Sequence, residues 1–69
     1  MKYLICRDIS GVRHTLCYDR VKSEAAWISE ERYPEVKERF RKVEYSDHSV
    51  AENRARTSCR GTYVLQINQ

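Results

Sequence analysis

The sequence predicts a small α+β domain in which an antiparallel sheet and a helical segment form a two-layer sandwich. Three patterns lead to this prediction: two paired segments near the N-terminus, apolar residues at helical spacing in the middle, and strict alternation near the C-terminus. With 69 residues, the chain is expected to form a single domain over residues 1–69. Its apolar fraction of 41% fits a folded chain rather than a disordered one.

Residues 2–19 are expected to form a β-hairpin around a two-residue turn at Ser10-Gly11. The register that follows sets opposite charges across from each other and gathers apolar side chains on one face, which a slip of one residue would undo. The expected pairs are Ile9–Val12, Asp8–Arg13, Arg7–His14, Cys6–Thr15, Ile5–Leu16, Leu4–Cys17, Tyr3–Tyr18 and Lys2–Asp19. The expected apolar face consists of Tyr3, Ile5, Ile9, Val12, Leu16 and Tyr18.

Residues 23–43 are expected to be helical and to cover the sheet. Ser23 is a suitable N-cap, and Pro34 disfavours helical backbone at Tyr33 while being well placed to start a new helix. The segment is therefore predicted to form two short helices, or one kinked helix, with a break at Tyr33-Pro34. The apolar residues at helical spacing are Val21, Ala25 and Ile28 before the break, and Val36, Phe40 and Val43 after it.

Three further elements are expected in the last third of the chain. Residues 42–46 are predicted to form a short third strand, and residues 49–56 a short helix or turn, because Ser49 and Glu52 have capping-box spacing. Residues 61–69 alternate and are predicted to form a strand inside the sheet, since Val64 adds an apolar side chain to its second face. If this strand instead lies at an edge, a second copy of the chain can pair with it, giving a homodimer.

The three cysteines and two histidines are the available metal ligands, but their spacing is unlike that of zinc modules, which supply closely spaced pairs. The hairpin register places Cys6 and Cys17 on one face and His14 on the other, so they cannot converge on one ion. We therefore expect no metal site and no cofactor. An odd number of cysteines also argues against a disulfide framework, and we expect reduced thiols that pack in the interior.

The sequence carries no motif for nucleophilic catalysis, and two glycines leave little room for a phosphate-binding loop. We therefore expect a protein that is not an enzyme. The enzyme class that fits best is a small ribonuclease of the toxin type, with Arg, His and Tyr side chains performing acid–base chemistry. The sequence shows no apolar run long enough to span a membrane and no secretory signal, so a cytoplasmic location is expected.

Nucleic-acid binding is one interpretation of the C-terminal charge pattern. Residues 53–69 contain no acid and carry Arg54, Arg56 and Arg60. On an extended segment, Arg54 and Arg56 would share one face at about the spacing of phosphates, and Tyr63 would be available to stack on a base. The net charge of +3 and the pI of about 8.9 are, however, only mildly basic for a dedicated nucleic-acid binder.

Docking on a larger protein or nucleoprotein partner is the preferred interpretation, because the chain lacks catalytic motifs and is rich in the residue types of binding hot spots. Such small chains are frequent among phage and mobile-element inhibitors of host machinery, and an anti-CRISPR or anti-restriction protein is the specific expectation. The alternative is a small RNA- or DNA-binding module that uses Arg54, Arg56, Arg60 and Tyr63. The expected protein-docking residues are Glu30, Glu31, Glu35 and Glu38 on an acidic helical face that would meet a basic groove, and Tyr33 at the helix break. Alternatively, Arg54, Arg56 and Arg60 would meet an acidic patch on the protein partner.

Overall fold

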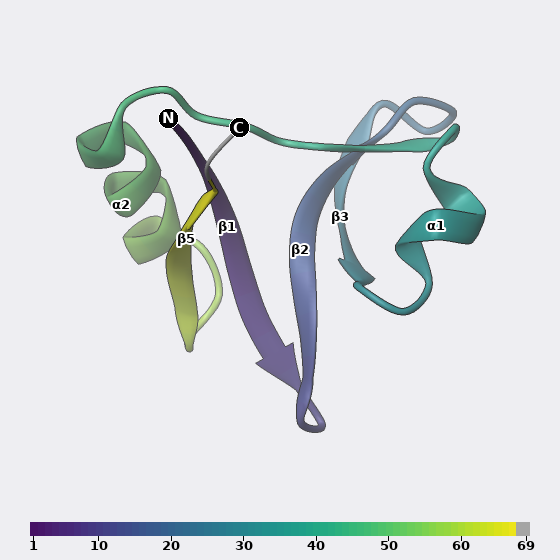
Figure 1. Cartoon of the computed structure of the whole chain (residues 1–69), viewed down its shortest axis with the longest axis horizontal. Coiled ribbons are helices and arrows are strands. Elements are labelled where there is room, and N and C mark those ends of the chain that lie inside the picture. The colour runs from purple at the N-terminus through teal and green to yellow at the C-terminus, as the bar shows by residue number, and fades with distance from the viewer. Residues whose placement is uncertain (68–69) are drawn as a thin grey trace.

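The computed structural model describes residues 1–67 and contains an antiparallel sheet of five strands with two helices (Figure 1). The predicted α+β class is therefore confirmed. The strand order is β3-β2-β1-β5, and β4 pairs with β2 off this path. The elements are β1 (Lys2–Ile9), β2 (Val12–Asp19), β3 (Glu24–Ser29), α1 (Tyr33–Val36), β4 (Phe40–Lys42), α2 (His48–Thr57) and β5 (Thr62–Ile67).

The half of the N-terminal hairpin that adjoins the turn follows the predicted register, from the Ile9–Val12 pair to the Cys6–Thr15 pair. The two turn residues Ser10 and Gly11 have φ values of 54° and 78°. Positive φ at both central positions characterises the type I′ turn, whose twist matches that of the flanking strands. Ser10 and Gly11 therefore fix the register of this half locally.

The other half of the hairpin is open, and the predicted pairs beyond Cys6–Thr15 are wrong. Figure 1 shows β1 and β2 diverging from the turn, with the segment that joins α1 to α2 crossing between their far ends. In this segment β4 pairs with residues 17–19 of β2, and Tyr45 forms a bridge to Tyr3 of β1. The opening lets residues 17–19 of β2 pair with β4 on one side and with β3 on the other, and Phe40 of β4 is buried at 8% exposure.

This opening also rearranges the predicted charge pairs. The expected Lys2–Asp19 ion pair is wrong, because the inserted segment separates the two strands. Instead, the Lys2 Nζ atom lies 3.2 Å from a carboxylate oxygen of Glu44, and Asp19 pairs with Arg39 at 3.1 Å. Lys2 of β1 and Asp19 of β2 therefore each form an ion pair with a residue of the segment that joins α1 to α2.

In the segment 23–43, the helix predicted before the break at Tyr33-Pro34 is wrong, because residues 24–29 form strand β3. Ser23 is not an N-cap but lies in the turn between β2 and β3 with φ of 54°. As a strand, this segment completes the ladder with β2 and places Trp27 and Ile28 on opposite faces, where each packs against a separate core cluster. Tertiary pairing thus overrides the moderate helix propensity of its alanines and glutamate. The predicted start of a helix at Pro34 agrees with α1 (Tyr33–Val36) to within one residue. The predicted break between two helices is wrong, because a strand and not a helix precedes α1, and residues 40–42 of the predicted second helix form β4.

The remaining elements agree more closely with expectation. Helix α2 is confirmed, but its N-cap is Asp47, whose carboxylate accepts bonds from the N–H groups of Ser49 and Val50. The strand expected over 42–46 lies earlier, as β4, followed by the isolated bridge at Tyr45. The C-terminal strand is confirmed as β5, but its expected position inside the sheet is wrong, since β5 is last in the strand order. Residues 68–69 of that prediction lie outside the described residues.

The sheet has two cores, one on each face. On the face that we call the α2 face, Ile5 and Leu16 pack with Ala55 of α2, which forms the second layer. On the opposite face, the α1 face, a second cluster packs against Tyr33 and Val36 of α1 and contains Cys17, Ile28 and Phe40. Among the described residues, no helix combines the length and the apolar character needed to cross a membrane.

Candidate functional site

The charged residues of the strands are distributed unequally between the two faces. Side chains alternate along each strand, and the pairing registers carry that alternation from strand to strand. All acidic residues of the strands fall on the α1 face, where they are accompanied by several basic residues. The acids are Asp8, Asp19 and Glu24. The basic residues Arg7, His14 and Arg41 have their strand positions on the α2 face, where the strands carry no acid.

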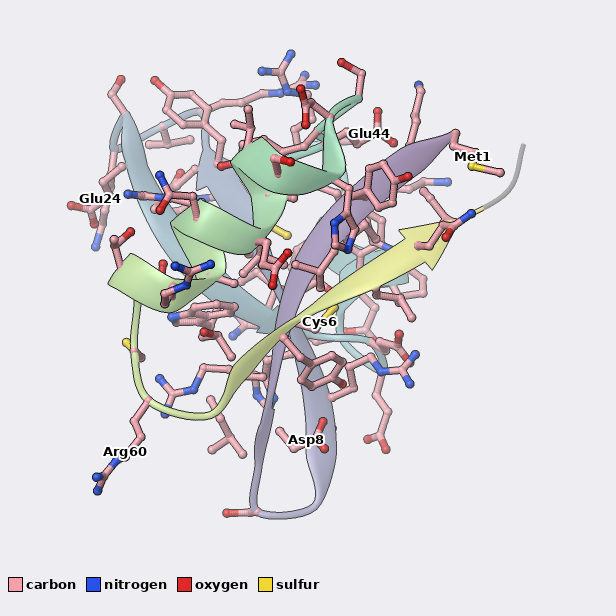
Figure 2. The ribbon with its side chains drawn as sticks, turned by 90° about the vertical axis from the view of Figure 1, so that its left-hand side faces the viewer. Met1, Cys6, Asp8, Glu24, Glu44 and Arg60 are labelled. Carbon is pink, nitrogen blue, oxygen red and sulfur yellow. The ribbon has the colours of Figure 1, made fainter. Side chains whose placement is uncertain are left out.

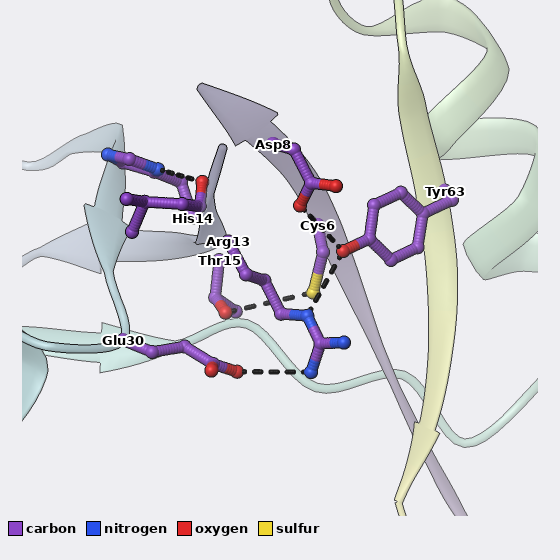
Figure 3. A network of polar contacts seen from close by, with 8 residues as sticks. Cys6, Asp8, Arg13, His14, Thr15, Glu30 and Tyr63 are labelled. Carbon is purple, nitrogen blue, oxygen red and sulfur yellow. Dashed lines mark hydrogen bonds and ion pairs between the residues drawn. The ribbon is translucent and has the colours of Figure 1, made fainter. Parts of the chain in front are cut away.

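On the α1 face, a polar network ties four strands or their ends together (Figure 3). The Tyr63 hydroxyl of β5 donates to Asp8 of β1 over 3.1 Å and accepts from Nε of Arg13 of β2 over 3.0 Å. The Arg13 guanidinium also bonds Glu30, just after β3, at 3.3 Å. Partial burial raises the pKa of Tyr63, while the Arg13 hydrogen bond acts in the opposite direction. In this network Arg13 is paired with the Glu30 carboxylate, and the Tyr63 hydroxyl joins Arg13 to Asp8.

Asp19 is the second compensated charge of the α1 face. Its buried carboxylate accepts two bonds of 3.1 Å from Arg39 and two more from the backbone N–H groups of Val21 and Lys22. The Arg39 hydrogen bonds are the main reason why the pKa of Asp19 is lowered to about 2. Because its oxygens are fully engaged, this carboxylate holds β4 against β2 and is not available to a ligand.

The α2 face is only partly covered by its helix. Figure 2 shows α2 over one part of the sheet, with the hairpin turn extending beyond it. We call the uncovered part, together with the half-buried Trp27 at its border with α2, the open half of the α2 face; its other sheet residues are Arg7, Ile9, Val12 and His14. The Arg7 guanidinium lies 5.6 Å from the centroid of the Trp27 ring, and the buried Arg7 Nε has no hydrogen-bond partner within residues 1–67. The open half therefore combines an aromatic ring with an uncompensated cation.

A hollow of about 370 Å³ extends this surface towards the end of α2. Trp27 and Arg54 both line it, so the hollow has a tryptophan from β3 and an arginine from α2. Arg60 follows in the turn before β5 and projects into solvent (Figure 2). Within the described part of the chain, none of Arg7, Arg54 and Arg60 forms an ion pair with a carboxylate. The other lining residues are Leu16, Ala25, Thr57, Ser58 and Cys59.

Comparison with protein-family models, curated proteins and solved structures finds no match to this chain. Its function must therefore be inferred from the chemistry of its own surface.

The structure separates the arginines that the sequence grouped together. Arg54 and Arg56 lie in helix α2 rather than on an extended segment, so the prediction that they share a face is wrong: helical positions two apart point to different sides. Arg54 lines the hollow beside Trp27, whereas Arg56 lines a cleft beside β5. Tyr63 has its strand position on the α1 face, and its hydroxyl is engaged in the network described above.

The predicted acidic helical face does not form, because most of that segment is not helical. Of its four glutamates only Glu35 lies in α1, and Glu30 bonds Arg13. Glu31 and Glu38 lie in turns among basic residues, and Tyr33 packs against the second core with the Lys42 ammonium 4.6 Å from its ring centroid. The segment thus presents mixed charges rather than one acidic surface.

Sequence reasoning missed Arg7, His14 and Trp27 as a group. The hairpin register already paired Arg7 with His14, and strand alternation placed both beside Ile9 and Val12. The missing information was that Trp27 belongs to a strand adjacent to β2. Because this segment was predicted to be a helix, the only tryptophan of the chain could not be assigned to the sheet surface on which it lies.

The cysteines do not form a reactive centre. Burial raises the pKa of Cys6, whose sulfur lies 3.7 Å from the Thr15 hydroxyl, and raises the pKa of Cys17 to about 11. Both thiols are therefore protonated at neutral pH and poor nucleophiles. Cys59 is exposed. Within residues 1–67, no three His, Cys, Asp or Glu side chains form a group able to hold a metal ion.

Proposed function

We propose that this chain is a non-enzymatic binding protein that contacts single-stranded nucleic acid, free or within a nucleoprotein complex, through the open half of the α2 face. The observation that carries the proposal is the unequal charge distribution of the strands. Their acids lie on the α1 face, while Arg7 and His14 share the α2 face with Trp27.

A phosphate backbone binds best where cations have no carboxylate partner to give up. Arg7, Arg54 and Arg60 meet this condition within the described residues, whereas Arg13 and Arg39 are bonded to carboxylates. Neutralising phosphates releases counterions from the nucleic acid, which makes such binding steeply dependent on salt. The arginines around Trp27 thus supply the sequence-independent part of the proposed affinity.

The aromatic component favours single strands over duplexes. Unstacked bases can reach an aromatic ring or a guanidinium plane, and one such stack contributes about 1–3 kcal/mol. Trp27 and the Arg7 guanidinium beside it offer a surface of this kind. Contact with nucleic acid also agrees with action as a phage or mobile-element inhibitor of a nucleic-acid-handling complex, which is part of this proposal.

Fluorescence provides a direct test, because Trp27 is the only tryptophan in the chain. A single-stranded RNA or DNA oligonucleotide of mixed sequence should quench Trp27 emission, and binding followed by anisotropy should weaken steeply as salt is raised. Arg7→Glu combined with Arg54→Glu should lower the affinity at least tenfold. The matched control is Arg32→Glu with Lys37→Glu, which changes the net charge equally outside the open half.

Three outcomes would contradict the proposal. One is the absence of binding to any single-stranded oligonucleotide at low salt. The second is equal loss of affinity in the two double variants, which would mean that only overall charge matters. The third is recovery of a stoichiometric protein partner that needs Arg7 and Arg54 but contains no nucleic acid, which would assign the same surface to a protein.

A further inference from the structure

Among residues 1–67, one side of the backbone of strand β5 has no partner. Which residues of β5 face that side can be derived from the bridge at Tyr3. Tyr3 donates its N–H to Tyr45 over 2.8 Å and accepts from Tyr45 over 2.9 Å, so both groups point away from β5. Backbone direction alternates along an antiparallel ladder. The even-numbered residues of β1 therefore face β5, and their partners Tyr63, Leu65 and Ile67 face β1. Thr62, Val64 and Gln66 consequently direct their N–H and C=O groups outward.

This free edge lacks the features that protect sheets from pairing with another chain. Natural edge strands carry charged residues, prolines or bulges. Strand β5 has the sequence TYVLQI, with no charge and no proline, and its six residues pair with β1 without interruption. Nothing in this strand opposes the addition of a further strand.

The opposite edge of the sheet shows the contrast. Strand β3 begins with Glu24 and is followed by Glu30 and Glu31. Antiparallel pairing of β3 with its own copy would bring Glu24 near Glu30 of the second chain, and like charges across a ladder are destabilising. Pairing of β5 with its own copy carries no such penalty, so the two edges differ in their capacity for self-association.

Helix α2 supplies complementary charges beside the same edge. A cleft of about 410 Å³ lies between α2 and the start of β5, and His48, Glu52 and Arg56 form a row along it at a spacing of four residues. A two-fold axis near Val64 reverses this row in the second copy. This reversal sets Glu52, which pairs with His48 of its own chain at 3.5 Å, beside a row of the second copy that contains the basic Arg56.

We propose that two copies of this chain pair antiparallel through β5, joining their sheets across a two-fold axis, with Glu52 and Arg56 in contact between the copies. Thr62, Val64 and Gln66 provide the hydrogen bonds. The proposal does not depend on the nucleic-acid proposal, since it uses the edge of the sheet and not the open half of the α2 face.

Light scattering at millimolar protein concentration tests the assembly. The expected mass is twice the chain mass of 8.2 kDa. Gln66→Pro removes an outward N–H without breaking a bond to β1 and should give the monomer, whereas Gln66→Ala keeps the N–H and should remain dimeric. A monomeric wild type, or a Gln66→Pro variant that stays dimeric, would overturn the proposal.

Amide hydrogen exchange and a charge swap test the geometry and remain informative if Gln66→Pro fails to fold. In the dimer, Val64 and Gln66 should be protected along with Tyr63 and Leu65, whereas a monomer should protect only the latter two. Glu52→Arg and Arg56→Glu should each weaken dimerisation, and the double variant should restore it. Exchange that follows the monomer pattern at all concentrations, or a double variant weaker than both single variants, contradicts the arrangement.

Discussion

The two faces of this sheet differ in whether their charged side chains are paired with opposite charges. On the α1 face, Tyr63 joins Asp8 to Arg13, Arg13 bonds Glu30, and Asp19 is bonded to Arg39. On the α2 face, apolar packing under α2 gives way to a surface on which cations have no carboxylate partner within the described residues. Compensated charge holds strands together, whereas uncompensated charge remains available for a ligand. This contrast predicts which substitutions change stability and which change binding.

The largest effect on stability is expected under α2. Leu16 is 5% exposed in the core of the α2 face, and Leu16→Ala should lower the free energy of unfolding by about 2–5 kcal/mol because it leaves a cavity. Urea denaturation measures this difference. The control is Val21→Ala, since Val21 is 73% exposed and should change stability little. Equal effects of the two substitutions would show that this core does not exist as described.

A smaller loss is expected in the core of the α1 face. Cys17→Ser places a hydroxyl group in the apolar cluster with Ile28 and Phe40 and should cost about 1–3 kcal/mol. Cys59→Ser is the exposed control. Mass spectrometry after brief alkylation of the folded wild type should find one modified cysteine, Cys59. Rapid alkylation of Cys6 or Cys17 would mean that the interior is open.

The ion pair of the α1 face should appear as a pH dependence. Since folding lowers the pKa of Asp19 from 3.8 to about 2, the carboxylate stabilises the fold above pH 4, and this contribution is lost as the pH falls from about 4 to 2. Asp19→Asn should therefore be less stable than wild type at pH 7 and closer to it at pH 2. Glu35→Gln, in the exposed first turn of α1, is the control. A stability difference independent of pH in this range would contradict the assignment.

The smallest effect is expected from the exposed network. Tyr63→Phe removes the hydroxyl that joins Asp8 to Arg13 and should cost at most about 1 kcal/mol, because hydrogen bonds and ion pairs near solvent contribute little. It should leave oligonucleotide affinity unchanged, since Tyr63 has its strand position on the face opposite Trp27. A tenfold loss of affinity would move the binding surface to the α1 face.

The sequence allowed prediction wherever local chemistry decides the structure. Ser10 and Gly11 determine the turn and the near half of the hairpin, Pro34 marks the start of α1, and the alternation of residues 62–67 predicts β5. Such reasoning fails for the segment around Trp27. Its helix propensity is moderate, but it pairs with the side of β2 that β1 does not occupy and therefore forms a strand. The open half of the α2 face could not be predicted from the sequence, because its aromatic ring, that of Trp27, lies on strand β3.

Residues 40–45 lie between the far ends of β1 and β2 and divide the hairpin into two parts whose pairing is determined by different segments of the chain. The near half is encoded within residues 6–15, because its turn and pairs need no other segment. In a peptide containing only residues 1–20, nothing would prevent the far half from closing, with Lys2 opposite Asp19. In the whole chain that half is specified from a distance, by Phe40 and Tyr45. The pairing of the far half is thus set by a later segment of the chain and not by the turn that joins the two strands.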